Sequence, residues 1–331
     1  MPKHGRRKGH AKMRLFEHAD FEQAILRAEQ HYRSQGLRAA IIEKDYYVTE
    51  ALRLIATTDD RVIFKGGTSL SKGWNLLNRF SEDIDIFLNP TAFDPKLGTN
   101  AINRELKQLR NAIASHPGLS LQKEESKTIG GFGRNDRFAY HQRFGGVGEV
   151  ANKVFLEAGT ASGKQPIETR ELQSYLAQFL RETDQSLGAE DETPFSMRLL
   201  HFRRTFVEKL FAIHAKVELL KRDGRNIGSY ARHYYDLYQL ARTPDIPAML
   251  TTTEYAEIKA DYDRISSTFF ARDYFAPKDF RFSNSDALFP DDELQTALAT
   301  EYEAQCKQLC FGAYPSWKEV CAEFEKLRSL L

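Results

Sequence analysis

The chain has 331 residues, of which 41% are hydrophobic and 28% are charged. These fractions exclude a wholly disordered chain, because enough apolar side chains are present to build a sizeable core. No run approaches the ~20 consecutive apolar residues that cross a bilayer as a helix, so we expect no membrane contact. The net charge of +1 conceals an uneven distribution. Residues 1–14 hold six cations and no acid, which leaves 41 basic against 46 acidic side chains and a net charge of −5 in residues 15–331.

The basic segment 1–14 is predicted to be a flexible tail. Its cations are Lys3, Arg6, Arg7, Lys8, Lys12 and Arg14. No apolar stretch follows them, so the segment does not indicate a secretory signal. Two interpretations stay open. The tail either tethers RNA through phosphate contacts, which supply most non-specific affinity for nucleic acid, or is a solvated terminus.

Three cysteines, Cys306, Cys310 and Cys321, lie in the last tenth of the chain. Their number is odd and their spacing is not CxxC, which favours reduced thiols over disulfides or a zinc site. Reduced thiols are typical of a cytoplasmic protein, and this is the location that we expect.

The first half of the chain predicts helices followed by strands. Apolar residues at helical spacing predict helices over 21–35, 37–57 and 100–115, and apolar or alternating runs predict strands over 61–65, 81–88, 119–127, 137–144 and 152–157. Thr68 or Ser69 is expected to cap a helix that runs toward Leu77. The pattern indicates a mixed-sheet domain over residues 15–165 that begins with helices.

The second half of the chain predicts helices alone. The helical period fits residues 168–182, 203–221, 229–241, 253–270, 291–308 and 316–330. We therefore predict a C-terminal helical domain over residues 166–331. The fold class is α+β, with a sheet domain followed by a helical bundle.

A glycine pair, Gly66-Gly67, stands at a predicted strand-to-helix junction. Glycines let the backbone approach a ligand closely, and the N–H groups at the start of a helix favour phosphate. Neither the GxxxxGK[ST] nor the GxGxxG spacing is present, so the segment is not one of the common phosphate loops. Lys65, Lys72 and Arg79 flank the pair and are candidates to neutralise the charge of a phosphate.

Two aspartates, Asp83 and Asp85, alternate with Ile84 and Ile86 in a predicted strand. Residues i and i+2 of a strand face the same side, so the two carboxylates are expected to lie together. Adjacent like charges on a strand repel unless a cation opposes them. A hard divalent ion, Mg²⁺ or also Mn²⁺, meets this need and is typical of phosphoryl transfer. The alternative is a pair of ordinary surface acids on an edge strand.

The ordered motifs resemble those of the AbiEii/AbiGii toxin family of the polymerase-beta-like nucleotidyltransferase superfamily. Gly66–Leu70 followed by Arg79–Asp85 is similar to the nucleotidyltransferase signature. Ile42–Thr49 is similar to an N-terminal helix motif of the family, and Arg204–Leu210 and Tyr235–Tyr238 are similar to two later helical motifs. The resemblance covers roughly residues 40–240, and it implies a polymerase-beta-like sheet domain.

The resemblance also implies how the nucleotide is bound. Gly66 and Gly67 match the glycine pair of the family, and Thr68 with Ser69 would contact the triphosphate through N–H and hydroxyl groups. Many relatives have Gly-Ser where this chain has Gly67-Thr68, which shifts the hydroxyl that is used. Lys72, expected from its position near the glycine pair, and Lys209 complete the set of expected nucleotide-binding residues.

For the catalytic centre, the resemblance implies metal ligands and two further residues. Asp83 and Asp85 match the metal-binding pair, and Glu157 on a later strand is the candidate third carboxylate. Lys209 matches a lysine that reaches the nucleotide phosphates. Asp236 matches an acid tied to catalysis or nucleotide positioning.

Without the family resemblance, the sequence gives weaker indications of a role for Lys209 and Asp236. Lys209 lies in an amphipathic helix, where a lysine is usually solvated. Asp236 lies in an apolar stretch, so it either faces outward or is paired, and Lys209 is a plausible partner. His141, His201, His214 and His233 show no ligand or triad spacing, and we assign them no role.

The resulting hypothesis is a metal-dependent nucleotidyltransferase that transfers NMP from an NTP to an acceptor hydroxyl. The family implies RNA, in some relatives a tRNA 3′ end, as acceptor, and the role of toxin in a toxin–antitoxin or phage-defence pair. Its expected partners are an NTP, RNA and a cognate antitoxin, which need not contact the toxin if it is a DNA-binding repressor. Two alternatives are a protein-nucleotidylating (AMPylation-type) enzyme and a non-catalytic nucleotide- or RNA-binding module.

Overall fold

The computed structural model describes residues 13–81, 83–145, 150–272, 274–276 and 279–331. Most of the predicted tail, residues 1–12, lies outside these ranges. Arg14, its last cation, lies inside them and forms ion pairs with Glu50 at 3.7 Å and Glu190 at 3.3 Å. Arg14 therefore contacts the folded body, whereas the flexibility of the tail stays a prediction.

The described residues combine helices with strands, as the α+β prediction requires. The helices are α1 (Phe21–His31), α2 (Ala39–Thr58), α3 (Gly66–Lys72), α4 (Thr99–Ala114), α5 (Tyr175–Glu182), α6 (Phe202–Asp223), α7 (Arg232–Ala241), α8 (Asp245–Leu250), α9 (Thr253–Phe269), α10 (Asp292–Leu309) and α11 (Trp317–Leu327). The strands are β1 (Ile63–Lys65), β2 (Asp83–Phe87), β3 (Ser120–Leu121), β4 (Lys127–Ile129), β5 (Gly133–Ala139), β6 (Lys153–Gly159), β7 (Ile167–Leu172) and β8 (Phe195–Leu200). The α+β class is confirmed.

Within the described residues, these strands form one mixed sheet in the order β3-β5-β6-β2-β1-β8-β7, with β4 added on β5. Strand β2 lies in the middle, antiparallel to β1 and parallel to β6. Its isoleucines, Ile84 and Ile86, are buried. They pack in a core that also contains residues of α1, α2 and α4, while the aspartates of β2 face the other side.

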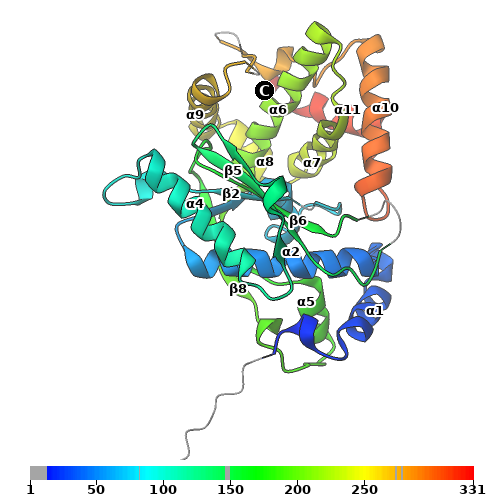
Figure 1. Ribbon diagram of the computed structural model, residues 1–331. Helices are drawn as coiled ribbons and strands as arrows, with labels where there is room; N and C mark the ends of the chain where they lie inside the picture. The colour runs from blue at the N-terminus through cyan, green and yellow to red at the C-terminus, as the bar shows by residue number, and fades with distance from the viewer. Residues whose placement is uncertain (1–12, 82, 146–149, 273, 277–278) are drawn as a thin grey trace, which may run out of the picture.

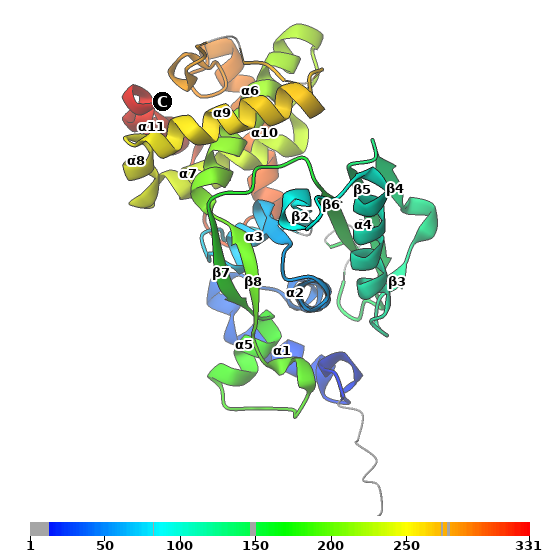
Figure 2. The same cartoon turned by 90° about the vertical axis from the view of Figure 1, so that its left-hand side faces the viewer.

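A second core holds the C-terminal helices together and lies above the sheet in Figure 1. Residues of α6, α7, α10 and α11 form most of it, and Leu70 and Leu77 join it from the sheet-bearing half. Figure 2 shows α9 lying across this helical layer, above α3 and the ends of the central strands. None of the helices in the described ranges is both long and apolar enough to span a bilayer.

The prediction of a helix over residues 168–182 is wrong in its first half. Strand β7 occupies Ile167–Leu172, and only Tyr175–Glu182 is helical. As the edge strand, β7 has exposed or half-buried residues along most of its length, so it shows no apolar alternation. Strand β8 was not predicted, although Phe195, Met197 and Leu199 alternate with polar residues for part of its length.

These two strands extend the sheet beyond the predicted domain boundary at residue 165. Strand β8 pairs in parallel with β1, and β7 pairs with β8. Helix α5 packs against α1 and α2 rather than against the C-terminal helices. We therefore propose a division near residue 201, just before α6, in place of the division between 165 and 166.

Three local predictions also need correction. The strand expected over 119–127 is broken by a 3₁₀ turn between β3 and β4, and the strand expected over 137–144 begins earlier, at Gly133, and ends at Ala139. Helix α3 begins at Gly66 and ends at Lys72. Thr68 and Ser69 thus lie inside α3 and do not cap it.

Candidate active site

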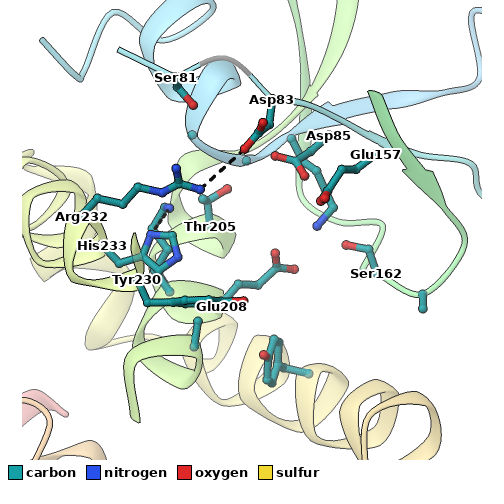
Figure 3. Close-up of a pocket in the computed structure, with 18 of the residues that line it drawn as sticks. Ser81, Asp83, Asp85, Glu157, Ser162, Thr205, Glu208, Tyr230, Arg232 and His233 are labelled. Carbon is teal, nitrogen blue, oxygen red and sulfur yellow. Dashed lines mark hydrogen bonds and ion pairs between the residues drawn. The ribbon is translucent and has the colours of Figure 1, made fainter. Parts of the chain in front are cut away.

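The strand register gathers three carboxylates on one face of the sheet. Asp85 of β2 lies opposite Glu157 of the parallel strand β6, and opposite Lys65 of the antiparallel strand β1. Asp83 precedes Asp85 by two residues and faces the same side. Figure 3 shows Asp83, Asp85 and Glu157 side by side at the wall of one cavity. The predicted grouping of the two aspartates with Glu157 is therefore what the strands produce.

Burial and mutual repulsion change the acidity of this group. Burial raises the pKa of Asp85, although Lys65 and Lys209 partly oppose the shift. Burial, with the charges of Asp85 and Asp83, raises the pKa of Glu157 to about 7. A hydrogen bond joins Asp85 to Glu157. Both carboxyl groups therefore bind a proton more tightly than free acids do, and a bound cation would compete with that proton.

The donor set suits a hard divalent ion, because it consists of carboxylate oxygens. In the described residues, however, no group of three or more His, Cys, Asp or Glu side chains is arranged to hold a metal. The carboxylate of Asp83 is turned toward Arg232, with 3.7 Å between Oδ2 and Nη2. Binding by all three carboxylates would therefore need Asp83 to turn away from Arg232.

A buried charge cluster forms the second component of the site. Both oxygens of Asp236 accept hydrogen bonds from Arg79, at 2.5 and 2.7 Å, and Oδ2 also lies 2.7 Å from Lys209 Nζ. Burial alone would raise the pKa of Asp236, but the charges of Arg79 and Lys209 hold it well below its ordinary value. The prediction that Lys209 pairs with Asp236 agrees with this geometry. Asp236 itself is fully buried and does not line the cavity, so any effect on a ligand would pass through the groups that it contacts.

Lys209 also orients a histidine to which the sequence assigned no role. Its Nζ lies 3.0 Å from Nδ1 of His233. Burial, with the charge of Lys209, lowers the pKa of His233 to about 3. The ring is therefore neutral. Because the ammonium group of Lys209 can only donate, Nδ1 accepts and the ring proton is assigned to Nε2.

Three predicted nucleotide-binding residues do not reach the cavity. Thr68 Oγ1 donates to the carbonyl oxygen of Asp83 at 2.5 Å, and Ser69 Oγ donates to the carbonyl oxygen of Gly66 at 2.9 Å. Lys72 lies at the far end of α3, where its Nζ is buried 2.5 Å from Asp45. These side chains hold α3 in place, and the prediction that they contact the triphosphate has no support in their positions.

The cavity between the carboxylates and the charge cluster has a volume of about 460 Å³. The predicted residues that line it are Lys65, Gly66, Gly67, Arg79, Asp83, Asp85, Glu157 and Lys209. It is also lined by residues that had not been assigned to the site, among them Ser81, Thr205, Glu208, Tyr230, Arg232 and His233 (Figure 3). Most of these come from α6 and α7, which the sequence could not place opposite β2.

The glycine pair is required where α3 passes the carboxylates. Gly66 has a φ of +79°, and a methyl group there would fall on the Asp85 carboxylate. A methyl group on Gly67 would lie 2.7 Å from Arg79 Nη2 and 3.0 Å from Ser81 Oγ. Both positions thus bring backbone against the charged side chains of the site.

Replacing Gly66 with alanine is expected to lower the free energy of unfolding by more than about 2 kcal/mol. The left-handed backbone costs an L-residue ~1–2 kcal/mol, and the overlap with Asp85 adds to this. Urea denaturation measures the change. Gly188→Ala is the matched control, because Gly188 has a φ of +78° but open space around it. Equal losses in the two variants would contradict the role of the Asp85 contact.

Comparison with known proteins places this chain in a family. Residues 51–323 match the family described as nucleotidyl transferase AbiEii toxin, type IV toxin–antitoxin system. The chain belongs to this AbiEii family. It is a nucleotidyltransferase, as predicted, and a toxin of the type IV toxin–antitoxin class. Of the motifs used for the prediction, Ile42–Thr49 lies before the matched range and the others lie within it.

Among solved structures, the AbiEii-family chain is similar to MenT4, a nucleotidyltransferase toxin from Mycobacterium tuberculosis. The sequences are 16% identical, the TM-score is 0.48, and the superposition covers 93% of this chain and 95% of MenT4. No curated protein sequence matches this chain.

Proposed function

We propose that this AbiEii-family chain transfers NMP from an NTP to an acceptor hydroxyl of RNA, with a tRNA 3′ end as the expected acceptor, in a Mg²⁺- or Mn²⁺-dependent reaction. The observation that carries the proposal is the division of one cavity into two walls. The carboxylates of β2 and β6 form one wall, and cationic or hydrogen-bond-donating groups of α6 and α7 form the other.

The second wall is suited to the triphosphate. Lys209 and Arg232 supply positive charge, and His233 supplies an N–H group. Charge-assisted hydrogen bonds to phosphate are the stronger kind, so these groups would fix the position of the leaving pyrophosphate. Gly66 and Gly67 leave room for the nucleotide beside the carboxylates.

The first wall is suited to the reacting centre. Asp83, Asp85 and Glu157 would hold the divalent ion, which when bound neutralises phosphate charge and orients the reacting oxygens. The acceptor oxygen forms a bond to the α-phosphorus, the bond from that phosphorus to the bridging oxygen breaks, and pyrophosphate leaves. The hydroxyl proton is accepted by a carboxylate of this wall or by water.

The biological setting is also part of the proposal. The free thiols of Cys306, Cys310 and Cys321 are compatible with a reducing cytoplasm. The family description supports a cognate antitoxin as partner. Phage defence and neutralisation without direct contact are proposed from the family resemblance alone.

Incubation of the purified protein with Mg²⁺, each labelled NTP and total RNA tests this function. We expect a labelled RNA that ribonuclease removes and that is absent when EDTA replaces Mg²⁺. A label that resists ribonuclease and migrates with protein would favour protein nucleotidylation instead. Saturable NTP binding without release of pyrophosphate under any of these conditions would favour the binding module.

Arg232→Ala is expected to weaken NTP binding about 10-fold to 100-fold, because a charged hydrogen bond contributes ~1.5–3 kcal/mol. Isothermal titration calorimetry with a non-hydrolysable NTP measures this change. Arg225→Ala is the control, because Arg225 is also cationic but is 66% exposed and pairs with Asp223 outside the cavity. Equal affinity of the Arg232 variant and the wild type would remove Arg232 from the triphosphate site.

A further inference from the structure

A second cavity adjoins the candidate active site. It has a volume of about 470 Å³ and lies between the segment after β2, the β4–β5 turn and the C-terminal half of α9. Ser162, Gly163 and Ile265 line both cavities. A ligand in the second cavity could therefore continue into the first past the segment 161–164.

The second cavity opens on the side from which an acceptor must arrive. In phosphoryl transfer the attacking and leaving oxygens lie roughly in line across the phosphorus. The proposed pyrophosphate site is formed by Lys209 and Arg232. Figure 3 shows Glu157 and Ser162 on the side of the cavity away from Arg232. An acceptor hydroxyl in line with the leaving group would thus enter past Ser162, from the second cavity.

One hydroxyl at this entrance lacks a hydrogen-bond partner in the described part of the chain. Ser162 Oγ is shielded from solvent and forms no hydrogen bond with the residues that the structure describes. A buried polar atom without a partner is costly, so it is expected to meet a ligand group. A ribose hydroxyl at the end of an acceptor strand could satisfy it.

An aromatic cluster lies across the boundary between the two cavities. Phe269 lines the second cavity and Phe270 lines the first, with 42% and 44% of their surfaces exposed. The ring of Phe132, in the β4–β5 turn, lies 5.2 Å from that of Phe269 and 6.2 Å from that of Phe270. Exposed rings of this kind are platforms on which unpaired bases stack.

The charges around the second cavity favour a polyanion. Lys96 and Lys164 line it, are exposed, and form no ion pair with any described residue. Its acid, Asp261, is already paired with Arg204 at 2.7 Å and with Arg264 at 2.5 Å. The two lysines are therefore available for phosphate contacts, which give single-strand binding its salt dependence.

We propose that this second cavity is the acceptor channel and that it holds the single-stranded 3′ end of a nucleic acid. Bases stack on Phe132, Phe269 and Phe270, Lys96 and Lys164 contact the backbone phosphates, and Ser162 contacts the terminal ribose. This inference rests on the proposed function for the direction of attack, whereas the stacking and charge contacts can be tested without turnover.

The test uses a fluorescent single-stranded RNA oligonucleotide that carries 4-thiouridine at its 3′ end, without NTP or metal. Fluorescence anisotropy gives its Kd for the wild type, for Phe132→Ala/Phe269→Ala, whose rings line the second cavity and not the first, and for Lys96→Ala/Lys164→Ala. Photo-crosslinking followed by peptide mapping locates the 3′ end. Leu26→Ala is the control for loss of an exposed apolar side chain, because Leu26 is 43% exposed on α1. NTP affinity is measured for every variant.

We expect the phenylalanine variant to bind the oligonucleotide about 10-fold to 100-fold more weakly. The lysine variant should lower the slope of log Kd against log salt by about 1.4, since each single-strand phosphate contact contributes ~0.7. NTP affinity should be unchanged, and the crosslinks should map to residues 129–133 or 262–272. Unchanged oligonucleotide affinity in both variants, or an equal loss of NTP affinity, would overturn the proposal.

The outcomes separate this inference from the proposed function. Crosslinks in the channel together with no transfer of nucleotide to RNA would support the channel and reject the function. If the phenylalanine variant transfers nucleotide to subsaturating RNA at the wild-type rate, the channel is rejected and the proposed function still stands. The enzyme could instead label a protein, with less labelling by the phenylalanine variant than by the wild type. This result would show that the channel holds a protein acceptor, and it would overturn the nucleic-acid assignment.

Discussion

An Asp85→Asn variant is expected to lose nucleotide transfer by at least about 1000-fold, since the amide removes charge at the proposed metal site while keeping the shape of the side chain. The same variant should be more stable than the wild type in the absence of metal. Burial raises the pKa of Asp85, and its charge helps to raise that of Glu157 to about 7. Removing the charge therefore relieves repulsion within the carboxylate group.

The sign of this stability effect depends on pH. A carboxyl whose pKa is raised by folding binds its proton more tightly in the folded state, so the wild type loses stability as the pH rises through this range. For Glu157 the range extends from its ordinary value of 4.5 to about 7. The Asp85→Asn variant should lose less stability over this pH range. Its stability relative to the wild type should therefore increase from acidic to neutral pH.

Melting temperatures in EDTA between pH 5 and pH 8, together with initial rates of nucleotide incorporation, measure the two effects. Asp60→Asn is the control, because Asp60 is an exposed acid outside the cavity. If Asp85→Asn is both inactive and less stable than the wild type at neutral pH, the inferred repulsion among Asp83, Asp85 and Glu157 is contradicted.

The part of the site that sequence reasoning could predict is the part set by local geometry. The side chains of a strand alternate, so Asp83 and Asp85 had to share a face once β2 was predicted. Glu157 could be placed beside them only through the family resemblance, because no local rule fixes which strand pairs with β2. The register of β6 against β2 then brings it opposite Asp85.

The remaining site residues depend on contacts that are distant in the sequence. Arg232 and His233 reach the cavity because α7 packs on α6. The position of α7 also depends on the contact between Asp236 and Arg79, which are 157 residues apart in the chain. A lone arginine or histidine in a helix carries no signal of such a position. For Lys72 the error was one of direction, because it follows the glycine pair in sequence but lies at the opposite end of α3.

The fold shows the same division between local and long-range information. Long amphipathic helices such as α6 and α10 could be predicted from their periodicity. The edge strand β7 could not, because most of its side chains are only half-buried or exposed and its position comes from pairing with β8. The extension of the sheet past residue 165, on which the proposed division near residue 201 rests, could not be predicted for the same reason.

Asp236→Asn is expected to lower the free energy of unfolding by about 3–5 kcal/mol, the usual cost of breaking a buried ion pair from one side. Asp236 is fully buried and neutralises both Arg79 and Lys209. The amide keeps the shape of the side chain but leaves two buried cations without a counter-charge. Urea denaturation at neutral pH measures the loss. Asp286→Asn, which breaks the exposed pair with Lys221, is the control and should cost less than about 1 kcal/mol.

The effect should also depend on pH. Because Arg79 and Lys209 hold the pKa of Asp236 well below its ordinary value, the pair contributes its full stability above that ordinary value, ~3.9. The contribution is lost as the pH falls below ~3.9 toward the depressed pKa of the folded state. The wild type and Asp236→Asn should therefore differ most at neutral pH and converge in acid. A difference that is constant with pH would indicate that a packing defect, rather than the lost charge, causes the destabilisation.

A double-mutant cycle separates the structural role of Asp236 from its role in the site. Lys209→Met removes one of the two stranded cations, so it should cost less stability in the Asp236→Asn background than in the wild type. If Asp236 positions Lys209 for the triphosphate, Asp236→Asn should weaken NTP binding at temperatures where the variant is still folded. Lys209→Met should then weaken NTP binding little further in that background. Independent, additive losses of NTP affinity would mean that Lys209 finds the phosphates without Asp236, and that the buried carboxylate serves the fold alone.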